Sequence, residues 1–146
     1  MSTVPKRIYI IGKMRGLPNW NFEEFDRVAD YWRSSGWTVL SPAALDRACG
    51  YNSGSRVDDK YLKHVISMDI ACIMSADAVA VIPGWEDSVG STVEVALAQF
   101  LGLPIYCAKT CKELNLVQKP WEFHRKALDS IHRAIKTDIE ELKQGD

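Results

Sequence analysis

The sequence predicts an α/β protein, because short apolar segments typical of strands alternate with segments of helical periodicity. The segment 78–82 is wholly apolar, which is typical of a strand buried on both faces. Alternation of this kind predicts a parallel sheet of four or five strands with helices on both faces, a flavodoxin-like or Rossmann-like three-layer sandwich. The expected strands are residues 7–11, 37–40, 78–82 and 103–108.

The first helix follows a Gly-containing loop after the first strand. Asn19 or Asn21 can cap it, and apolar residues at helical spacing continue to about Ser35, where Gly36 is a plausible stop. Residues 43–57 show no clear period and are rich in Gly, Ser and Asn. They are expected to form a loop, long enough to suspect a function.

Three more helices are expected, at residues 58–75, 89–101 and 119–143. Ser88 can cap the helix 89–101. The segment 119–143 is amphipathic, and we expect it to pack on the sheet or on a second subunit. The length of the chain, 146 residues, predicts a single domain over 1–146.

Composition narrows the classes of function. With 47% hydrophobic and 25% charged residues, the chain is typical of a globular protein, and its net charge of −1 favours neither a nucleic acid polymer nor a membrane surface. No signal peptide or membrane span is expected, so the predicted location is cytoplasmic. Cys107 and Cys111 have a metal-like spacing, but no second pair or nearby His completes a site, so no metal or cofactor is expected.

Two carboxylates interrupt the apolar faces of predicted helices. Glu94 lies four residues after Gly90 and three before Leu97, so these residues share one face. Asp69 lies four residues after Val65 in the same kind of pattern. Each acid can be an edge residue that reaches water or pairs with a basic neighbour. Because a buried acid is costly unless it is paired or used, and glycosyl transfer needs two carboxyl groups, a catalytic pair is the alternative.

Two segments are candidate sites for an anion. Ser88 opens a helix, where free backbone N–H groups favour negative charge, and Gly90 keeps the first turn slim. Neither this helix start nor the loop described next matches a standard phosphate loop, and each can be an ordinary helix cap or turn. The second segment is the loop after the first strand, formed by Gly12, Lys13, Met14, Arg15 and Gly16.

The blocks IYIIGKMRGLPNWNF and SMDIACIMSADAVAVIPGWEDSVGSTVEVALAQFLGLPIY make the chain similar to the nucleoside 2-deoxyribosyltransferase-like superfamily over about residues 7–106. Phage and bacterial members of unknown function are the most similar. The resemblance implies that Glu94 is the nucleophile that forms a glycosyl ester. It implies that Asp69 positions the sugar or protonates the leaving base, that Tyr9 lies near the nucleophile, and that Gly90 lets the sugar approach.

The same resemblance implies a substrate class. Where the nucleoside transferases carry an Asp for the sugar 5′-hydroxyl, this chain has Ser88, as do relatives that hydrolyse nucleoside 5′-monophosphates. Those hydrolases also have a Gly-x-x-Arg-Gly loop, which Gly12, Arg15 and Gly16 match. The expected function is therefore an N-glycosidase acting on a nucleoside 5′-monophosphate. Asp87 leaves a base-exchanging nucleoside 2-deoxyribosyltransferase open.

Aromatic residues and partners complete the expectations. Trp85, and also Trp20 and Tyr51, can stack on the base or can simply fill the core. The resemblance also implies a homodimer or higher homo-oligomer. Two rival functions remain: a nucleotide-binding sensor or regulator without turnover, and an interaction protein that shares only the fold.

Overall fold

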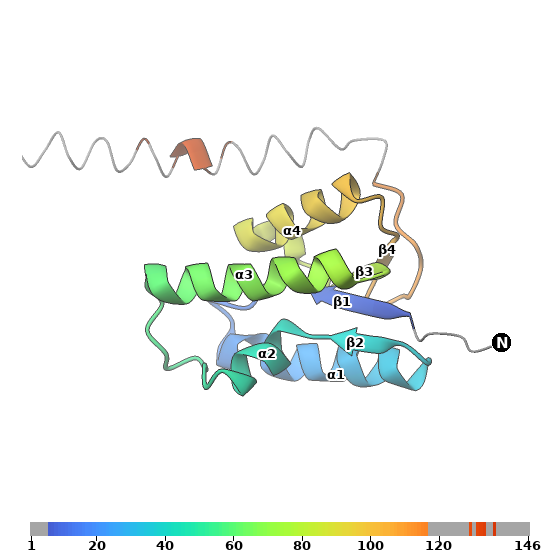
Figure 1. Cartoon of the computed structure of the whole chain (residues 1–146), viewed down its shortest axis with the longest axis horizontal. Coiled ribbons are helices and arrows are strands. Elements are labelled where there is room, and N and C mark those ends of the chain that lie inside the picture. Colours follow the sequence, from blue (N-terminus) through green and yellow to red (C-terminus); the bar gives the residue numbers. More distant parts are fainter. Residues whose placement is uncertain (1–5, 117–128, 130, 134–135, 137–146) are drawn as a thin grey trace, which may run out of the picture.

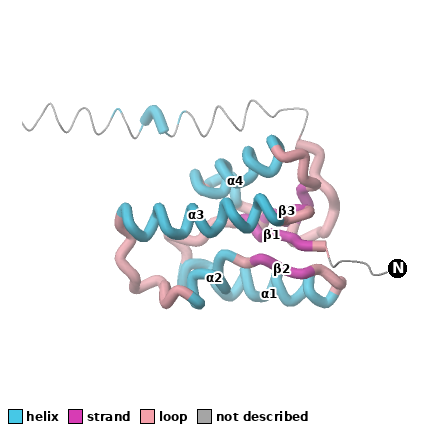
Figure 2. Tube along the Cα trace, viewed as in Figure 1, coloured by secondary structure: helices cyan, strands magenta, loops and turns pink. Residues whose placement is uncertain are grey.

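The computed structural model of the chain describes residues 6–116, 129, 131–133 and 136. Within them, four parallel strands form one sheet in the order β2-β1-β3-β4 (Figures 1 and 2). This is the flavodoxin-like arrangement, and it confirms the predicted fold class. The helix predicted over 119–143, together with its packing, falls mostly outside the described residues. The strands are β1 (Arg7–Ile11), β2 (Thr38–Leu40), β3 (Ala78–Val81) and β4 (Ile105–Cys107).

Helices cover both faces of the sheet, which gives the three expected layers (Figure 1). Helix α1 (Phe22–Ser34) packs on one face, while α3 (Asp59–Ser75) and α4 (Val89–Phe100) cover the other. Successive side chains of a strand point to opposite faces. Ile8 therefore belongs to the core beneath α1, whereas Tyr9 belongs to the core beneath α3 and α4.

The helix ends follow the expected chemistry. The Asp58 carboxylate caps α3 by accepting a hydrogen bond of 2.9 Å from the Tyr61 backbone N–H. Ser88 caps α4 in the same way, because its hydroxyl accepts a 3.2 Å bond from the backbone N–H of Ser91. Gly36, just beyond α1, has a φ of 95°, a conformation that favours glycine.

A short helix replaces the first part of the predicted loop 43–57. Helix α2 (Pro42–Ala48) follows the extended residue Ser41 and carries Pro42 at its start. Proline suits that position, because its φ is already helical and its missing N–H would have no partner there. Seven residues are too few to show a helical period in the sequence, so the loop prediction is wrong for this part.

None of the described helices combines the length and the apolar character that crossing a bilayer requires.

Candidate active site

The candidate site lies at the carboxyl ends of β1 and β3. The chain passes from β1 to β2 on one side of the sheet and then to β3 on the other, so this is the switch point of the fold. The loops after the two strands meet there with α3 and α4 around a cavity of about 290 Å³. Most predicted site residues line this cavity: Gly12, Lys13, Met14, Arg15, Asp69, Asp87, Ser88, Gly90 and Glu94.

Three predicted residues do not line it. Tyr9 is fully buried beneath the cavity, and Gly16 lies just beyond the lining, with a φ of 89°. Trp85 is buried in the core under α4, so the structure does not bear out its predicted contact with the substrate. Trp20 is also buried, and the Tyr51 ring packs 4.8 Å from that of Tyr61. The core, rather than a base, surrounds these rings.

The carboxyl groups of Glu94 and Asp69 both line the cavity. Burial, and then the negative charge of Asp69, raise the pKa of Glu94 to about 8. Burial raises the pKa of Asp69 to about 7, with the charge of Asp46 as the next cause. With a pKa of about 7 for Asp69 and about 8 for Glu94, the two groups together hold one proton between those pH values, and that proton lies mainly on Glu94. One acid and one carboxylate are thus available near neutral pH.

Tyr9 lies between the two acids. Its side chain points from β1 toward α3 and α4, and its hydroxyl makes no hydrogen bond of ordinary geometry among the described residues. That hydroxyl nevertheless interacts with both Glu94 and Asp69, and it lowers the pKa of each. Burial and then the two carboxylate charges raise the pKa of Tyr9 well above its usual value. Tyr9 therefore keeps its proton and can donate a hydrogen bond to the pair.

The charge of Arg15 acts on three carboxyl groups at or beside the site. It lowers the pKa of Glu94, of Asp69 and of a third carboxyl, Asp46. Burial nevertheless raises the pKa of Asp46 to about 6. Asp46 was not predicted as a site residue, because it lies on α2, which was expected to be a loop. The Ser-Pro start of that segment is the signal that could have revealed the helix.

Gly12 and Gly90 are glycines for different structural reasons. A Cβ on Gly12 would lie 3.0 Å from Ile82 and 3.1 Å from Phe25, so packing alone requires glycine there. A Cβ on Gly90 would meet only the Ser88 hydroxyl, at 3.9 Å, so the space beside the helix is open toward the cavity. Ser88 caps α4 and lines the cavity at once. Of these glycines, Gly90 is the one whose smallness leaves room for a ligand.

A larger cavity, of about 570 Å³, lies at the other end of α4. It is lined by residues such as Gln99, Pro104 and Leu116, and none of the predicted site residues reaches it. Among its described lining residues, Glu113 is the one carboxylate. We therefore place the candidate chemistry at the smaller cavity. Over the described part of the chain, no group of three metal-ligating side chains comes together.

Comparisons with known proteins agree with this fold. A 2-deoxyribosyltransferase from the psychrotolerant bacterium Bacillus psychrosaccharolyticus matches with a TM-score of 0.51 at 20% identity, over 69% of this chain and 70% of that one. The resemblance to the nucleoside 2-deoxyribosyltransferase-like superfamily is thereby confirmed at the level of the fold. No curated protein matches the chain. A family model described as a domain of unknown function, DUF4406, matches residues 6–107, and the chain therefore belongs to the DUF4406 family.

Proposed function

We propose that the protein cleaves the N-glycosidic bond of a nucleoside 5′-monophosphate through a covalent glycosyl ester of Glu94. The observation that carries the proposal is the coupled carboxyl pair Glu94 and Asp69 lining one cavity beside a helix N-terminus. Retaining glycosidic cleavage needs one ionised and one protonated carboxyl group. The likeness in fold to a 2-deoxyribosyltransferase supports the choice of an N-glycosidic bond.

In the first step, the Glu94 carboxylate attacks the anomeric carbon while the bond from that carbon to the base breaks. The base leaves with the electron pair of that bond and takes a proton from Asp69. Before the attack, the proton that Glu94 holds in the resting pair passes to Asp69. The positive charge that develops on the sugar beside Glu94 in the transition state favours this ionised form of Glu94. The Tyr9 hydroxyl stabilises the ionised form of each carboxyl group, because it interacts with both and lowers the pKa of both.

The 5′-phosphate would lie at the N-terminus of α4. Backbone N–H groups of that first turn and the helix dipole favour an anion, and Arg15 can hold a phosphate through two hydrogen bonds. Ser88 and Lys13 line the same part of the cavity, and Gly90 leaves it open. A 5′-monophosphate thus has both a cationic partner and room beside the helix.

In the second step, water attacks the anomeric carbon, gives a proton to Asp69 and releases the sugar phosphate and free Glu94. A second base in place of water would make the protein a transferase. Asp87 lines the cavity beside Ser88 and can accept a hydrogen bond from a sugar 5′-hydroxyl, which favours an unphosphorylated nucleoside for that alternative. The homodimer implied by the resemblance stays a prediction.

The test is to incubate the protein with ribo- and deoxyribonucleosides and their 5′-monophosphates and to follow free base by chromatography. We expect base release from a monophosphate, and a loss on the order of 10⁴-fold in Glu94→Gln, as for removal of a catalytic nucleophile. Mass spectrometry of the quenched reaction should find one sugar phosphate on the peptide that contains Glu94.

The other outcomes separate the alternatives. Base release that requires an added second base would establish the transferase. Binding of monophosphates without any base release would favour the sensor. Full activity in Glu94→Gln would overturn the assignment of the nucleophile.

A further inference from the structure

A third carboxyl group, which the proposed reaction does not use, lies beside the cavity. Asp46 on α2 is 4% exposed, although it does not line the cavity itself. A buried carboxyl group is costly unless it has partners. Its partners are Arg15 and Tyr61: the charge of Arg15 and the hydroxyl of Tyr61 both act on the Asp46 carboxyl group and lower its pKa, against the effect of burial.

Tyr61 is held rigidly at the start of α3. Its ring is 5.7 Å from that of Trp20 and 4.8 Å from that of Tyr51, and it is 4% exposed. The Tyr51 hydroxyl is in turn fixed by a 2.9 Å hydrogen bond with Nδ1 of His64. Because neighbouring rings hold the Tyr61 ring on both sides, its hydroxyl has a defined position.

Arg15 connects this fixed hydroxyl to the cavity. Its guanidinium carbon lies over the Tyr61 ring, 5.9 Å from the ring centre, and Arg15 lowers the pKa of the Tyr61 hydroxyl. Arg15 is otherwise exposed, and a free arginine side chain loses much rotamer entropy when it binds a ligand. A side chain that is already held loses less, and so binds more tightly.

We propose that Asp46 is a positioning residue that acts through Tyr61 to hold the Arg15 guanidinium ready for the 5′-phosphate of the substrate. In the proposed chain, the Tyr61 hydroxyl donates toward Asp46 and accepts from Arg15, and the contact of the guanidinium with the Tyr61 ring places these groups side by side. The inference rests on the proposed function, since it assigns the phosphate to Arg15.

The test compares wild type with Asp46→Asn, Arg15→Ala and the double variant. For Asp46→Asn we expect the KM of the 5′-monophosphate to rise about tenfold more than that of the matching nucleoside, as for the loss of one charged hydrogen bond. Each variant is measured at its own pH optimum, because the charge of Asp46 also raises the pKa of Asp69. The double variant should bind no more weakly than Arg15→Ala, because Asp46 acts through Arg15.

The matched control is Arg47→Gln on the same helix. It breaks the ion pair of Arg47 with Asp26 and leaves the Arg15 chain intact. If Arg47→Gln raises the KM of the monophosphate as Asp46→Asn does, a loosened α2 explains the effect and the inference is wrong. Equal losses for nucleoside and monophosphate, or additive losses in the double variant, would also overturn it.

Calorimetry with inorganic phosphate and with the 5′-monophosphate separates this inference from the proposed function. Absence of turnover would overturn the proposed function alone, if Asp46→Asn still weakens phosphate binding and Arg15→Ala abolishes it. Absence of phosphate binding in the wild type would overturn both. Should Asp46→Asn fail to fold, Tyr61→Phe keeps the ring and removes the link, and it should weaken phosphate binding in the same direction.

Discussion

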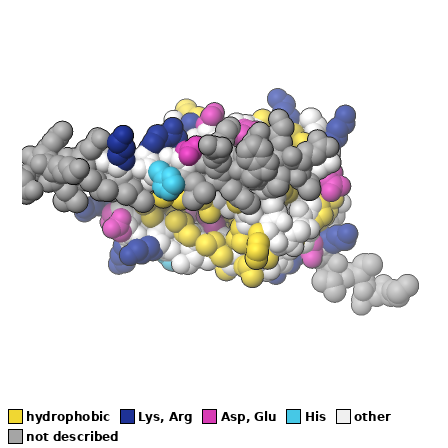
Figure 3. All heavy atoms as spheres, turned by 90° about the horizontal axis from the view of Figure 1, so that it is seen from above, with side chains coloured by type: hydrophobic (Ala, Val, Ile, Leu, Met, Phe, Trp, Pro, Cys, Tyr) yellow, Lys and Arg dark blue, Asp and Glu magenta, His cyan; other side chains and the backbone are white. Residues whose placement is uncertain are grey.

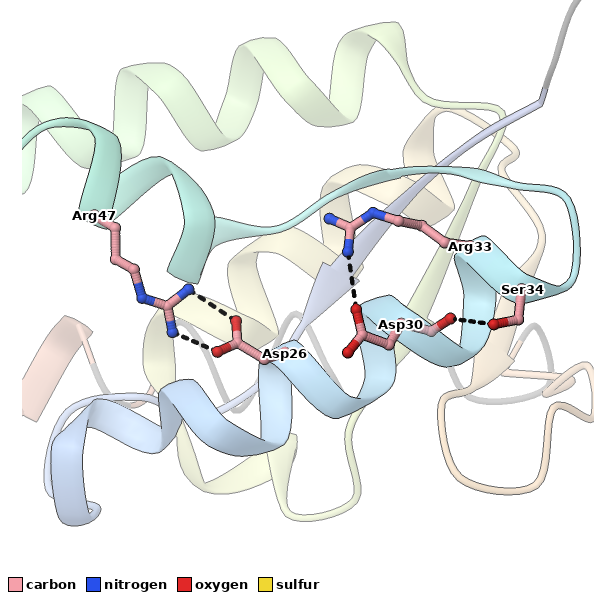
Figure 4. Close-up of polar contacts among 5 residues, drawn as sticks. All are labelled: Asp26, Asp30, Arg33, Ser34 and Arg47. Carbon is pink, nitrogen blue, oxygen red and sulfur yellow. Dashed lines mark hydrogen bonds and ion pairs between the residues drawn. The ribbon is translucent and has the colours of Figure 1, made fainter.

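The helical layers on the two faces of the sheet differ in where their charged side chains lie. Helix α1 carries acidic and basic side chains that face water and pair with one another (Figure 4). Asp26 binds Arg47 of α2 with a hydrogen bond of 2.9 Å, and Asp30 lies 3.2 Å from Arg33. Exposed pairs of this kind stabilise a fold by roughly 0.2 to 1 kcal/mol.

The layer on the other face of the sheet has few charges beyond the first turns of α3, which carry Asp59, Lys60 and Lys63. Over residues 66–75 of α3 and the whole of α4, the two ionisable acids are Asp69 and Glu94, and there is no basic residue. The outer surface of these helices is apolar instead, with Met74 61% and Phe100 85% exposed. Figure 3, which views this side of the molecule, shows hydrophobic side chains gathered on it.

The contrast shows that environment, rather than residue type, distinguishes the acids of this chain. On α1 a carboxylate faces water and a nearby cation, so its charge costs little. On α3 and α4 the acids turn inward, where burial and mutual repulsion raise the pKa of Glu94 to about 8. Such perturbed pairs in a cavity are typical of functional sites.

After the loss of Glu94 itself, the largest effect on base release is expected from removing the partner acid, Asp69. Asp69→Asn removes the proton donor for the leaving base, so we expect base release to fall on the order of 10²- to 10³-fold. It also removes the negative charge that raises the pKa of Glu94, so the pH at which Glu94 ionises should fall. The rate of base release measured from pH 4 to 9 tests both effects. An unchanged rate, or a profile that does not move, would contradict the coupled pair.

A smaller effect is expected on the stability of the fold when Glu94 is replaced. The folded pKa of Glu94, about 8, lies above its ordinary value of 4.5, so the folded state binds the proton more tightly than the unfolded chain does. Its contribution to stability is therefore present below pH 4.5 and is lost as the pH rises toward 8. Glu94→Gln should raise the free energy of unfolding at pH 8 by about 2 kcal/mol, because it removes the buried charge.

Thermal unfolding at several pH values measures this difference. At pH 4 the neutral acid and the amide are nearly equivalent, so the two proteins should have similar melting temperatures. Asp26→Asn is the control for a charge removed from the surface, and it should show no such dependence on pH above 5. If Glu94→Gln is less stable than the wild type at pH 8, the carboxyl group is better partnered than burial indicates.

The sequence alone was informative about the two acids on α3 and α4 and about the parallel sheet. Glu94 and Asp69 stand out because each interrupts an apolar face of a long helix, and the structure brings both to the cavity. The parallel sheet follows equally well, since the apolar strand 78–82 requires cover on both faces. Long periodic segments carry such information in their spacing.

Short segments and aromatic residues carry less. Helix α2 has only seven residues, too few to show a helical period in the sequence. Asp46 was therefore not recognised as a residue near the site. The burial of Trp85 depends on packing against strands distant in sequence, which spacing does not encode. Trp20 adopts a left-handed conformation with a φ of 51°, which a large side chain takes only when its surroundings hold it there.

The smallest effect is expected from a substitution in the layer formed by α1 and α2, whose charged side chains face water. Asp26→Asn breaks the ion pair that joins α1 to α2, and we expect it to lower the free energy of unfolding by less than about 1 kcal/mol, because both side chains remain largely in water. Base release should stay within about twofold of the wild type, since the pair does not touch the cavity. Denaturant unfolding at low and high salt measures the first effect, which screening should shrink. A loss of activity without a loss of stability would mean that the two layers are coupled through α2, where Arg47 adjoins Asp46, and that the separation drawn between them is too strict.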